Sequence, residues 1–244
     1  MNRFFIPQEW IEPDRVRLEE EFGHQIFHVL RLKPQDRVVV LDNAGMEYVV
    51  RLTRVDKKRA IGQIEETRAS QAEPSAQITL FQSMLKREKF EWVLQKCTEV
   101  GVVRIVPVIT TRSLAQKTEI KPGKMIRWKR ILREAAEQCG RGKVPELAEP
   151  IHLAESLEWP FDVRLMADLE GDLRSIHESL SRTDSKASPN IGVWIGPEGG
   201  FDPGEVDLAK KMDFSCVRLG RRTLRTETAA IVACTLILHE LKEL

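Results

Sequence analysis

From residue 77 to the end of the chain, short apolar segments of strand character alternate with longer segments of helical periodicity. Such alternation predicts a mostly parallel β-sheet with helices on its faces. Ligands of these sheets bind at the carboxyl ends of the strands, so functional residues are expected in the loops there. We expect strands at Ile78–Phe81, Val102–Val108, Val163–Ala167, Ile191–Ile195 and Cys216–Leu219, and helices at Lys86–Val100, Gly123–Gln138, Leu173–Ser181, Pro203–Met212 and Thr226–Leu241.

Residues 1–70 have a different pattern, with short Val- and Ile-rich segments joined by turn residues. One helix is expected at about Leu18 to Leu30. Three or four strands with one helix suggest a small β-barrel. The segment 69–76 is polar, small and contains Pro74, which is typical of a linker. The sequence therefore predicts two domains, at residues 1–72 and 76–244. The expected strands of the first are Arg3–Ile6, Asp36–Leu41, Met46–Val55 and Arg59–Glu65.

The charges are unevenly spread, although the formal net charge is only +1. Residues 76–150 carry 15 basic and 8 acidic side chains, an excess of seven. This excess suits a phosphate-binding face, and a solvated helix surface remains the alternative.

The compartment is predicted from what the sequence lacks. No apolar stretch reaches the ~18–20 residues of a membrane helix, and the N-terminus has no secretory pattern. The four cysteines form no CxxC pair, which favours reduced thiols in a cytoplasmic protein without membrane contact. His24 and His28 lie four residues apart without a third ligand, so no metal site is expected.

The segment Ile195-Gly196-Pro197-Glu198-Gly199-Gly200 ends an apolar strand and precedes a helix. Its glycines allow positive φ and close approach of a ligand, and its proline fixes the turn. The carboxylate of Glu198 would repel phosphate and suits ribose hydroxyls or a cation. S-adenosylmethionine offers both a ribose and a sulfonium. An ordinary tight turn is the alternative interpretation.

A second loop, Leu219–Ala230, also joins a strand to a helix. Thr226 suits the helix cap, and the free N–H groups of the first turn can receive a carboxylate. A solvated basic loop is the alternative. The following helix is apolar almost all round from Ala229 to Leu238, which predicts burial by its own domain plus a partner subunit, and hence a homodimer.

Together, IGPEGGF and LGRRTLRTETA resemble the cofactor loops of the SPOUT methyltransferases. More closely, the chain resembles the family that methylates uracil N3 in small-subunit ribosomal RNA. The likeness extends over nearly the whole chain. It includes Arg3-Phe4-Phe5, His28-Val29-Leu30-Arg31, Lys96–Gly101, Glu137–Arg141 and Val144-Pro145.

This resemblance implies an α/β fold: a small PUA-like β-barrel, followed by a SPOUT domain with a parallel sheet and a deep C-terminal trefoil knot. It also implies a homodimer that binds S-adenosylmethionine at the knot. The implied cofactor-binding residues are Leu165, Met166, Ile195, Gly196, Pro197, Glu198, Gly199, Gly200, Leu219, Gly220, Leu224 and Thr226.

The implied reaction is methylation of a uridine N3 in 16S ribosomal RNA within the small subunit. Arg225 is the candidate for electrostatic stabilisation, and Glu198 or Glu227 for removing the proton or orienting groups. Phosphate contacts are expected from Arg3, Arg31, Lys86, Arg112, Arg133 and Arg141. The residues alone leave open a transfer RNA or ribose-hydroxyl substrate, and a non-enzymatic RNA-binding assembly factor.

Overall fold

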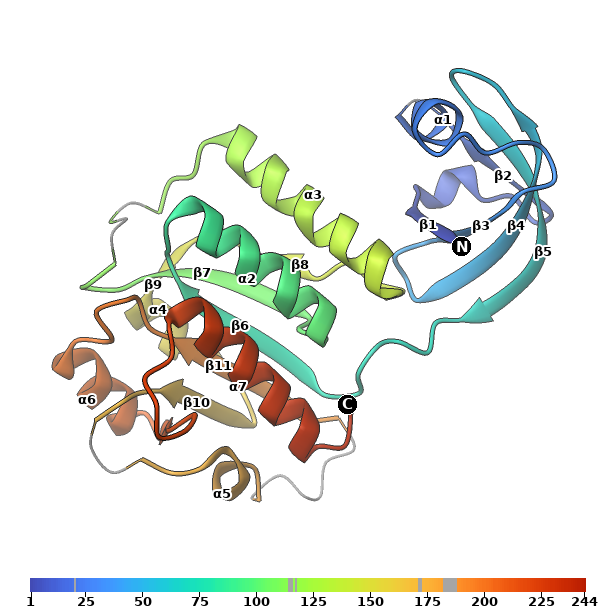
Figure 1. Ribbon diagram of the computed structural model, residues 1–244. Coiled ribbons are helices and arrows are strands. Elements are labelled where there is room, and N and C mark those ends of the chain that lie inside the picture. The colour runs from blue at the N-terminus through green and yellow to red at the C-terminus, as the bar shows by residue number, and fades with distance from the viewer. Residues whose placement is uncertain (20, 114–115, 117, 171–172, 182–187) are drawn as a thin grey trace. The chain divides into compact units, whose positions relative to one another are not determined.

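The computed structural model describes residues 1–19, 21–113, 116, 118–170, 173–181 and 188–244. The chain divides into two compact units (Figure 1). The N-terminal unit contains residues 1–73 and 136–144, and the C-terminal unit contains 74–135 and 145–244. The division at 73/74 lies within the segment of linker composition. The second stretch, 136–144, has no compositional signal and lies outside the limits drawn from the sequence.

The N-terminal unit is built on a curled five-stranded sheet with the order β1-β3-β4-β5-β2 (Figure 1). The β1–β3 pair is parallel, and the β3–β4, β4–β5 and β5–β2 pairs are antiparallel. A register shift in the β4–β5 pair, at Val49/Val50, marks an irregularity of the kind that bends a sheet. The strands are β1 (Asn2–Phe5), β2 (Arg15–Leu18), β3 (Arg37–Leu41), β4 (Met46–Val55) and β5 (Ala60–Ala69).

The expected helix at Leu18 to Leu30 is shorter than predicted. Residues Arg15–Leu18 alternate between exposed and buried side chains, which is strand periodicity, and they pair with β5. The helical part is α1 (Glu21–His24), continued by the π-helical turn Gln25–Val29. Phe22 and Ile26 are buried there and pack on the sheet core with Phe4, Val38 and Val50. A 3₁₀ turn, Gln8–Trp10, precedes β2.

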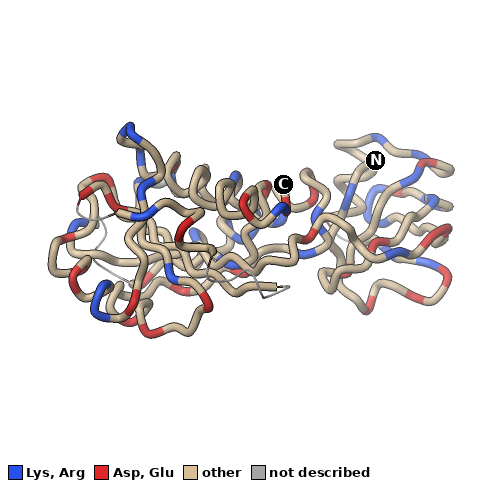
Figure 2. The backbone as a smooth tube through the Cα atoms, turned by 90° about the horizontal axis from the view of Figure 1, so that it is seen from below, with Lys and Arg blue, Asp and Glu red and all other residues tan. Residues whose placement is uncertain are grey.

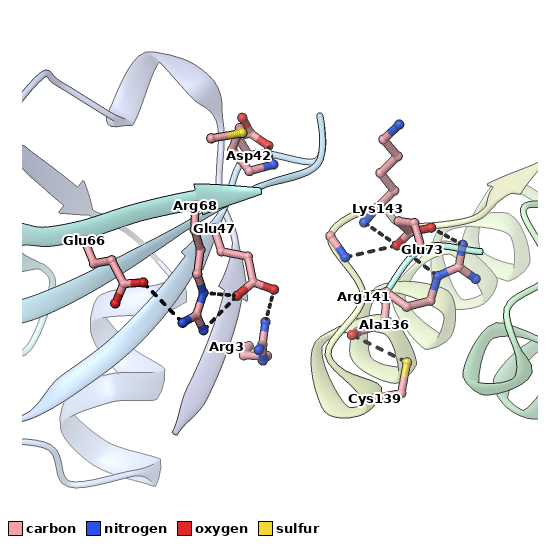
Figure 3. A network of polar contacts seen from close by, with 12 residues as sticks. Arg3, Asp42, Glu47, Glu66, Arg68, Glu73, Ala136, Cys139, Arg141 and Lys143 are labelled. Atoms are coloured by element: carbon pink, nitrogen blue, oxygen red, sulfur yellow. Dashed lines mark hydrogen bonds and ion pairs between the residues drawn. The ribbon is translucent and has the colours of Figure 1, made fainter. Parts of the chain in front are cut away.

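The stretch 136–144 belongs to this unit because polar and apolar contacts hold it there (Figure 3). Ala136 is buried against Phe5 and Leu41. The Glu73 carboxylate accepts hydrogen bonds from the Arg141 side chain at 2.7 and 3.2 Å and from the backbone N–H of Gly142 at 3.0 Å.

The C-terminal unit contains a seven-stranded sheet whose strand pairs are all parallel within the described residues, and the sequence predicted a mostly parallel sheet. The order is β12-β10-β11-β6-β7-β8, and β9 also pairs with β7. The strands are β6 (Gln77–Ser83), β7 (Arg104–Ile109), β8 (Glu146–Leu147), β9 (Ile151–His152), β10 (Val163–Ala167), β11 (Asn190–Ile195) and β12 (Ser215–Val217). The two-residue strands β8 and β9 are too short to give a sequence pattern.

Helices cover both faces of this sheet (Figure 1). On one face α7 (Thr226–Glu240) contacts β6, β11 and α2 (Arg87–Val100). On the other, α4 (Leu153–Leu157) and α6 (Pro203–Lys211) enclose a cluster that includes Phe81, Met166 and Trp194. The remaining helices are α3 (Pro122–Cys139) and α5 (Ile176–Leu180); part of the predicted helix Leu173–Ser181 lies outside α5.

Aromatic packing explains one glycine of β11. The ring of Trp194 stacks on Phe81, with centroids 4.1 Å apart, and its Nε1 donates to Ser156 Oγ at 2.8 Å. A Cβ at Gly192 would lie 2.4 Å from the Trp194 ring. Gly192 is therefore required by packing behind the sheet and not by a ligand.

Candidate functional site

A pocket of about 360 Å³ lies at the carboxyl ends of neighbouring strands in the C-terminal unit. Ala167 and Ile195 end β10 and β11, and the loop after β12 contributes its residues from Leu219 onward. The first turn of α7 closes another side with Thr226. The parallel sheet thus brings together loops that are distant in the sequence, where such sheets bind ligands.

Most predicted cofactor and catalytic residues line this pocket. They are Ile195, Gly196, Pro197, Glu198, Gly200, Leu219, Gly220, Leu224, Arg225 and Thr226. Four others do not. Leu165 and Met166 are fully buried inside β10, Gly199 faces Arg112, and Glu227 contacts the lining residue Lys89 without lining the pocket itself.

The loop after β11 is a braced turn. Gly200 N donates to Pro197 O at 2.9 Å, and Gly200 has a φ of +69°, a conformation that favours glycine. Arg112 donates to the carbonyls of Gly199 and Phe201 at 3.0 and 3.2 Å. A Cβ at Gly196 would lie 3.2 Å from the Phe201 ring. The backbone of this loop is therefore held from outside while its inner side stays open.

The loop after β12 joins the first one through Thr226. The sequence predicted Thr226 as the cap of the following helix, and this is wrong: Arg225 occupies the cap position, with φ −64° and ψ 149°. Thr226 is the first helical residue, and its buried hydroxyl donates to the carbonyl of Gly196. No side chain of the described residues caps the helix, so N–H groups of its first turn remain available. Gly220 has a φ of +144°.

An ion-pair cluster lies at the pocket wall. The Lys89 Nζ lies 3.1 Å from Glu198 Oε1 and 3.6 Å from Glu227 Oε2. Burial raises the pKa of Glu198, but its own backbone N–H and the Lys89 ammonium outweigh this and lower that pKa below its usual value. Hydrogen bonding to Glu198 raises the pKa of Lys89. Both groups are therefore charged at neutral pH.

Several pocket residues were not predicted from the sequence. Asp168 and Leu169 directly follow β10, where the apolar run ends, and that change of character could have indicated them. Lys89 comes from α2, and no local pattern distinguishes it from other helix-surface lysines. The other unpredicted lining residues are Ala167, Arg222, Thr223 and Ala229.

The predicted phosphate-binding residues of the C-terminal unit differ in their surroundings. Lys86 is exposed just before α2. Arg133 is half-buried on α3. Arg112 is engaged with the Gly199 and Phe201 carbonyls and lies 3.4 Å from Asp202. Its observed contacts give Arg112 a role in holding the pocket loop.

The predicted phosphate-binding residues of the N-terminal unit also differ in their surroundings. Arg31 is exposed in a left-handed conformation with φ +53°. Arg3 pairs with the buried Glu47 at 2.9 Å (Figure 3). Arg141 is only 3% exposed and paired with Glu73 at 2.7 Å. A phosphate would have to displace Glu73 to reach Arg141, so the structure does not favour the predicted phosphate contact.

A shallow polar hollow of about 740 Å³ lies on the N-terminal sheet. Basic and acidic residues are interspersed along the backbone of this unit (Figure 2). Carboxylates hold the hollow's arginines in place, since Glu65 pairs with both Arg37 and Arg51 at 2.7 Å. Sequence reasoning identified only Arg3 here. The hollow is lined by Met1, Arg3, Arg37, Val39, Val49, Arg51, Gln63, Ile64, Glu65, Glu66 and Arg68.

Among the described residues, no cluster of three or more His, Cys, Asp or Glu side chains could hold a metal ion. His24 and His28 lie close, with ring centroids 4.7 Å apart. Within the same described parts of the chain, no helix has the length and apolar character needed to cross a membrane.

Two family models match the chain. An RNA methyltransferase domain matches residues 71–238, and an RNA methyltransferase PUA domain matches residues 19–65. With the parallel sheet and its pocket of glycine-bearing loops, these matches define the class as RNA methyltransferases. The predicted α/β fold with a parallel sheet and a PUA-like N-terminal domain is thereby confirmed, as is the predicted class of RNA methyltransferase.

Individual relatives narrow the class further. Ribosomal RNA small subunit methyltransferase E of Synechocystis is 32% identical over 95% of this chain and 75% of that protein. The Bacillus subtilis protein of that name is 29% identical over 98% and 97%. The crystal structure of the Neisseria gonorrhoeae enzyme of that name, bound to S-adenosylmethionine, has a TM-score of 0.86, 30% identity and coverage of 98% and 97%. The chain belongs to the ribosomal RNA small subunit methyltransferase E family.

Proposed function

We propose that the protein transfers a methyl group from S-adenosylmethionine to N3 of a uridine in 16S ribosomal RNA. The observation that carries this proposal is the pocket between the loops that follow β11 and β12, beside the uncapped start of α7. The names of its relatives support small-subunit ribosomal RNA as the substrate. The structure from Neisseria gonorrhoeae supports S-adenosylmethionine as the cofactor.

The residues present fit this cofactor. The pocket volume lies within the ~300–1,000 Å³ of small-molecule sites. Among the residues that the structure describes, nothing lies within 4 Å of the Cβ that a side chain would add at Gly200 or Gly220, so these residues leave the backbone accessible from those directions. Apolar surface for a flat base comes from Ala167, Leu169, Ile195, Leu219, Leu224 and Ala229.

Charged groups of the pocket match the remaining parts of the cofactor. The free N–H groups at the start of α7 suit its carboxylate. The Glu198 and Asp168 carboxylates line the pocket and suit ribose hydroxyls or the positive sulfur. When bound, S-adenosylmethionine supplies a methyl group activated by a sulfonium.

The chain's own residues must orient the uracil and compensate the charge that it gains as N3 loses its proton. Arg225 lines the pocket, and no ion pair engages it within the described residues. Its fixed positive charge suits the uracil oxygens. The lowered pKa of Glu198 makes it a weak proton acceptor. We therefore assign Glu198 to orientation and charge complementarity, and leave Glu227 as the alternative candidate.

The N-terminal domain, residues 1–72, is proposed to bind RNA, and residues 76–244 to carry out the transfer. Exposed Arg31 and the arginine-lined hollow support the first role. Lys86 and Arg133 are the proposed phosphate contacts of the second domain. We propose that the assembled small subunit in the cytoplasm is the substrate.

A homodimer and a C-terminal trefoil knot complete the proposal. On α7, Ala230, Ala233 and Ile237 are buried, whereas Ile231, Val232, Thr235 and Leu236 remain half-exposed. This second apolar stripe is suited to a partner subunit. Sedimentation at micromolar concentration should give twice the 28.0 kDa chain mass; a single species of chain mass would rule out the dimer.

The decisive experiment is single-turnover methylation with labelled cofactor, followed by mass spectrometry of the modified nucleoside. Small ribosomal subunits, free 16S ribosomal RNA and transfer RNA are compared. We expect 3-methyluridine in the subunit RNA. A label on transfer RNA or on a ribose hydroxyl would change the substrate assignment. Failure of the protein to bind S-adenosylmethionine would favour an RNA-binding assembly factor.

A further inference from the structure

Lys89 joins three segments that are distant in the sequence. It belongs to the first turn of α2, Glu198 to the loop after β11, and Glu227 to the first turn of α7. All three lie in the C-terminal unit. Only the contact with Glu198, at 3.1 Å, is short enough for a hydrogen bond. One ammonium therefore lies between two carboxylates at the wall of the pocket.

The neighbouring interactions make Lys89 more than a surface ion pair. Its side chain is 31% exposed, and that of Glu227 is 15% exposed. The Oε2 atom of Glu227 is buried and has no hydrogen-bond partner among the described residues. Losing the ammonium would leave two carboxylates facing each other beside this buried oxygen. Their repulsion would act on both cofactor loops at once.

We propose that Lys89 is a positioning residue: its ammonium ties the Glu198 loop to the start of α7 and so keeps the pocket in its binding conformation. The inference rests on the proposed S-adenosylmethionine site. Lys89 acts through Glu198, whose orientation and ionisation it maintains. The proposal therefore predicts an effect on cofactor affinity and on its pH dependence.

The pH dependence follows from the groups around Glu198. Lys89 and, through its field, Lys86 favour the ionised carboxylate, whereas burial opposes it. Glu227 shares Lys89, and Asp168, Arg222 and Arg225 are the other charged residues lining the same pocket. Without Lys89 the pKa of Glu198 would rise, because burial would then be opposed only by the backbone N–H of Glu198 and by Lys86. Its negative charge, and the attraction for the sulfonium, would then be lost at a higher pH than in the wild type.

The test measures S-adenosylmethionine affinity by calorimetry for wild type, Lys89→Met and Lys89→Arg from about pH 8 to about 5.5. Lys89→Met should weaken binding about fivefold to tenfold at neutral pH, as expected for a partly exposed charge-assisted hydrogen bond. The loss should grow as the pH falls, while the wild type stays flat. Lys89→Arg keeps the charge and should restore most of the affinity.

The matched control is Arg127→Met, which removes another ion pair of α2. Arg127 binds Glu91 at 2.7 and 2.8 Å, on the side of α2 that meets α3. This variant should bind the cofactor like the wild type. Equal losses in both variants, or wild-type affinity and pH profile for Lys89→Met, would overturn the proposal. A lack of rescue by Lys89→Arg in a protein of unchanged melting temperature would also overturn it.

A double-mutant cycle identifies the partner. If Lys89 acts through Glu198, Lys89→Met and Glu198→Gln should be non-additive in cofactor affinity. Additive losses would separate the two residues and reject the positioning role. Failure of the wild type itself to bind would instead contradict the proposed function, so the two failures are distinguishable.

Discussion

Replacing Thr226 by Val removes one hydroxyl while keeping the shape of the side chain. That hydroxyl donates to the carbonyl of Gly196 and lies 3.4 Å from Gln82 Nε2, and Thr226 is only 6% exposed. Gln82 keeps its bond to the Ser83 carbonyl at 3.1 Å. The principal loss is therefore the hydrogen bond to one partly buried acceptor, the Gly196 carbonyl. A buried polar group left without its partner costs about 1–3 kcal/mol.

This cost should appear in both stability and binding. For a domain of this size, about 1 kcal/mol lowers the melting temperature by about 2–4 °C, so we expect a decrease of about 2–12 °C. Cofactor affinity should also fall, because the Gly196 loop loses its bond to α7.

The assays are calorimetric melting without ligand and titration with S-adenosylmethionine. Thr226→Ser retains the hydroxyl and is the control. It should keep the affinity while losing only the methyl group's packing. Wild-type melting and affinity for Thr226→Val would refute the conclusion that this hydroxyl holds the two loops together. Equal losses of affinity in both variants would refute it as well.

Three further predictions separate the roles of individual charges. Arg225→Ala should lower the rate of single-turnover methylation at saturating RNA by about 10²-fold, with little change in cofactor affinity. Arg31→Ala should instead weaken RNA binding and reduce its salt dependence. If excess RNA restored the activity of Arg225→Ala, the two assignments would have to be exchanged. Arg141→Met should destabilise the protein by about 3 kcal/mol in denaturant titrations, because the Glu73 carboxylate would stay partly buried without its positively charged partner. An unchanged unfolding midpoint, together with a weaker salt dependence of RNA binding, would instead support the contact between Arg141 and a phosphate that the sequence predicted. Burial raises the pKa of Glu47, but hydrogen bonds from Arg3 and Arg68 outweigh this and lower it. Its stabilising contribution is therefore present above the usual value of 4.5 and lost as the pH falls below it. Glu47→Gln should be less stable than the wild type at pH 7, and the difference should shrink at about pH 3.5 in denaturant titrations; a constant difference would contradict this assignment.

The pocket loops could be found from the sequence because each is a local pattern. A β-strand, a loop that contains glycine and a helix follow one another around Ile195–Gly200 and again around Leu219–Thr226. Parallel strands end at the same edge of a sheet, so the two loops could be expected to meet. Leu165 and Met166 were taken from a resemblance and lie inside β10 instead. Leu165 and Met166 are covered by packing on the two faces of the sheet, while Ala167 at the end of the strand and Asp168 just beyond it line the pocket.

Contacts between distant segments could not be predicted in this way. Nothing near Arg141 in the sequence indicates that the Glu73 carboxylate will pair with its guanidinium and so compete with a phosphate for it. Likewise, Thr226 is a residue type that often caps helices. Its hydroxyl donates instead to the Gly196 carbonyl, and this bond follows from the position of Gly196 in the fold. The sequence around an arginine or a threonine does not show whether its side chain binds a ligand or another part of the same chain.

The contacts at the pocket suggest a division of labour between residues that hold its loops and groups that remain available to a ligand. Arg112, which does not line the pocket, and Thr226, which does, bind loop carbonyls, and Lys89 in the pocket wall neutralises carboxylates that would otherwise repel each other. The glycine backbone, the N–H groups of the first turn of α7 and Arg225 remain available. Because the polar groups that fix the loops are already satisfied by the chain, a ligand need not order them when it binds. Pre-organisation of this kind lowers the entropic cost of binding. It also explains why substitutions at Thr226 and Lys89 should affect affinity, whereas a substitution at Arg225 should act mainly on the rate of the chemical step.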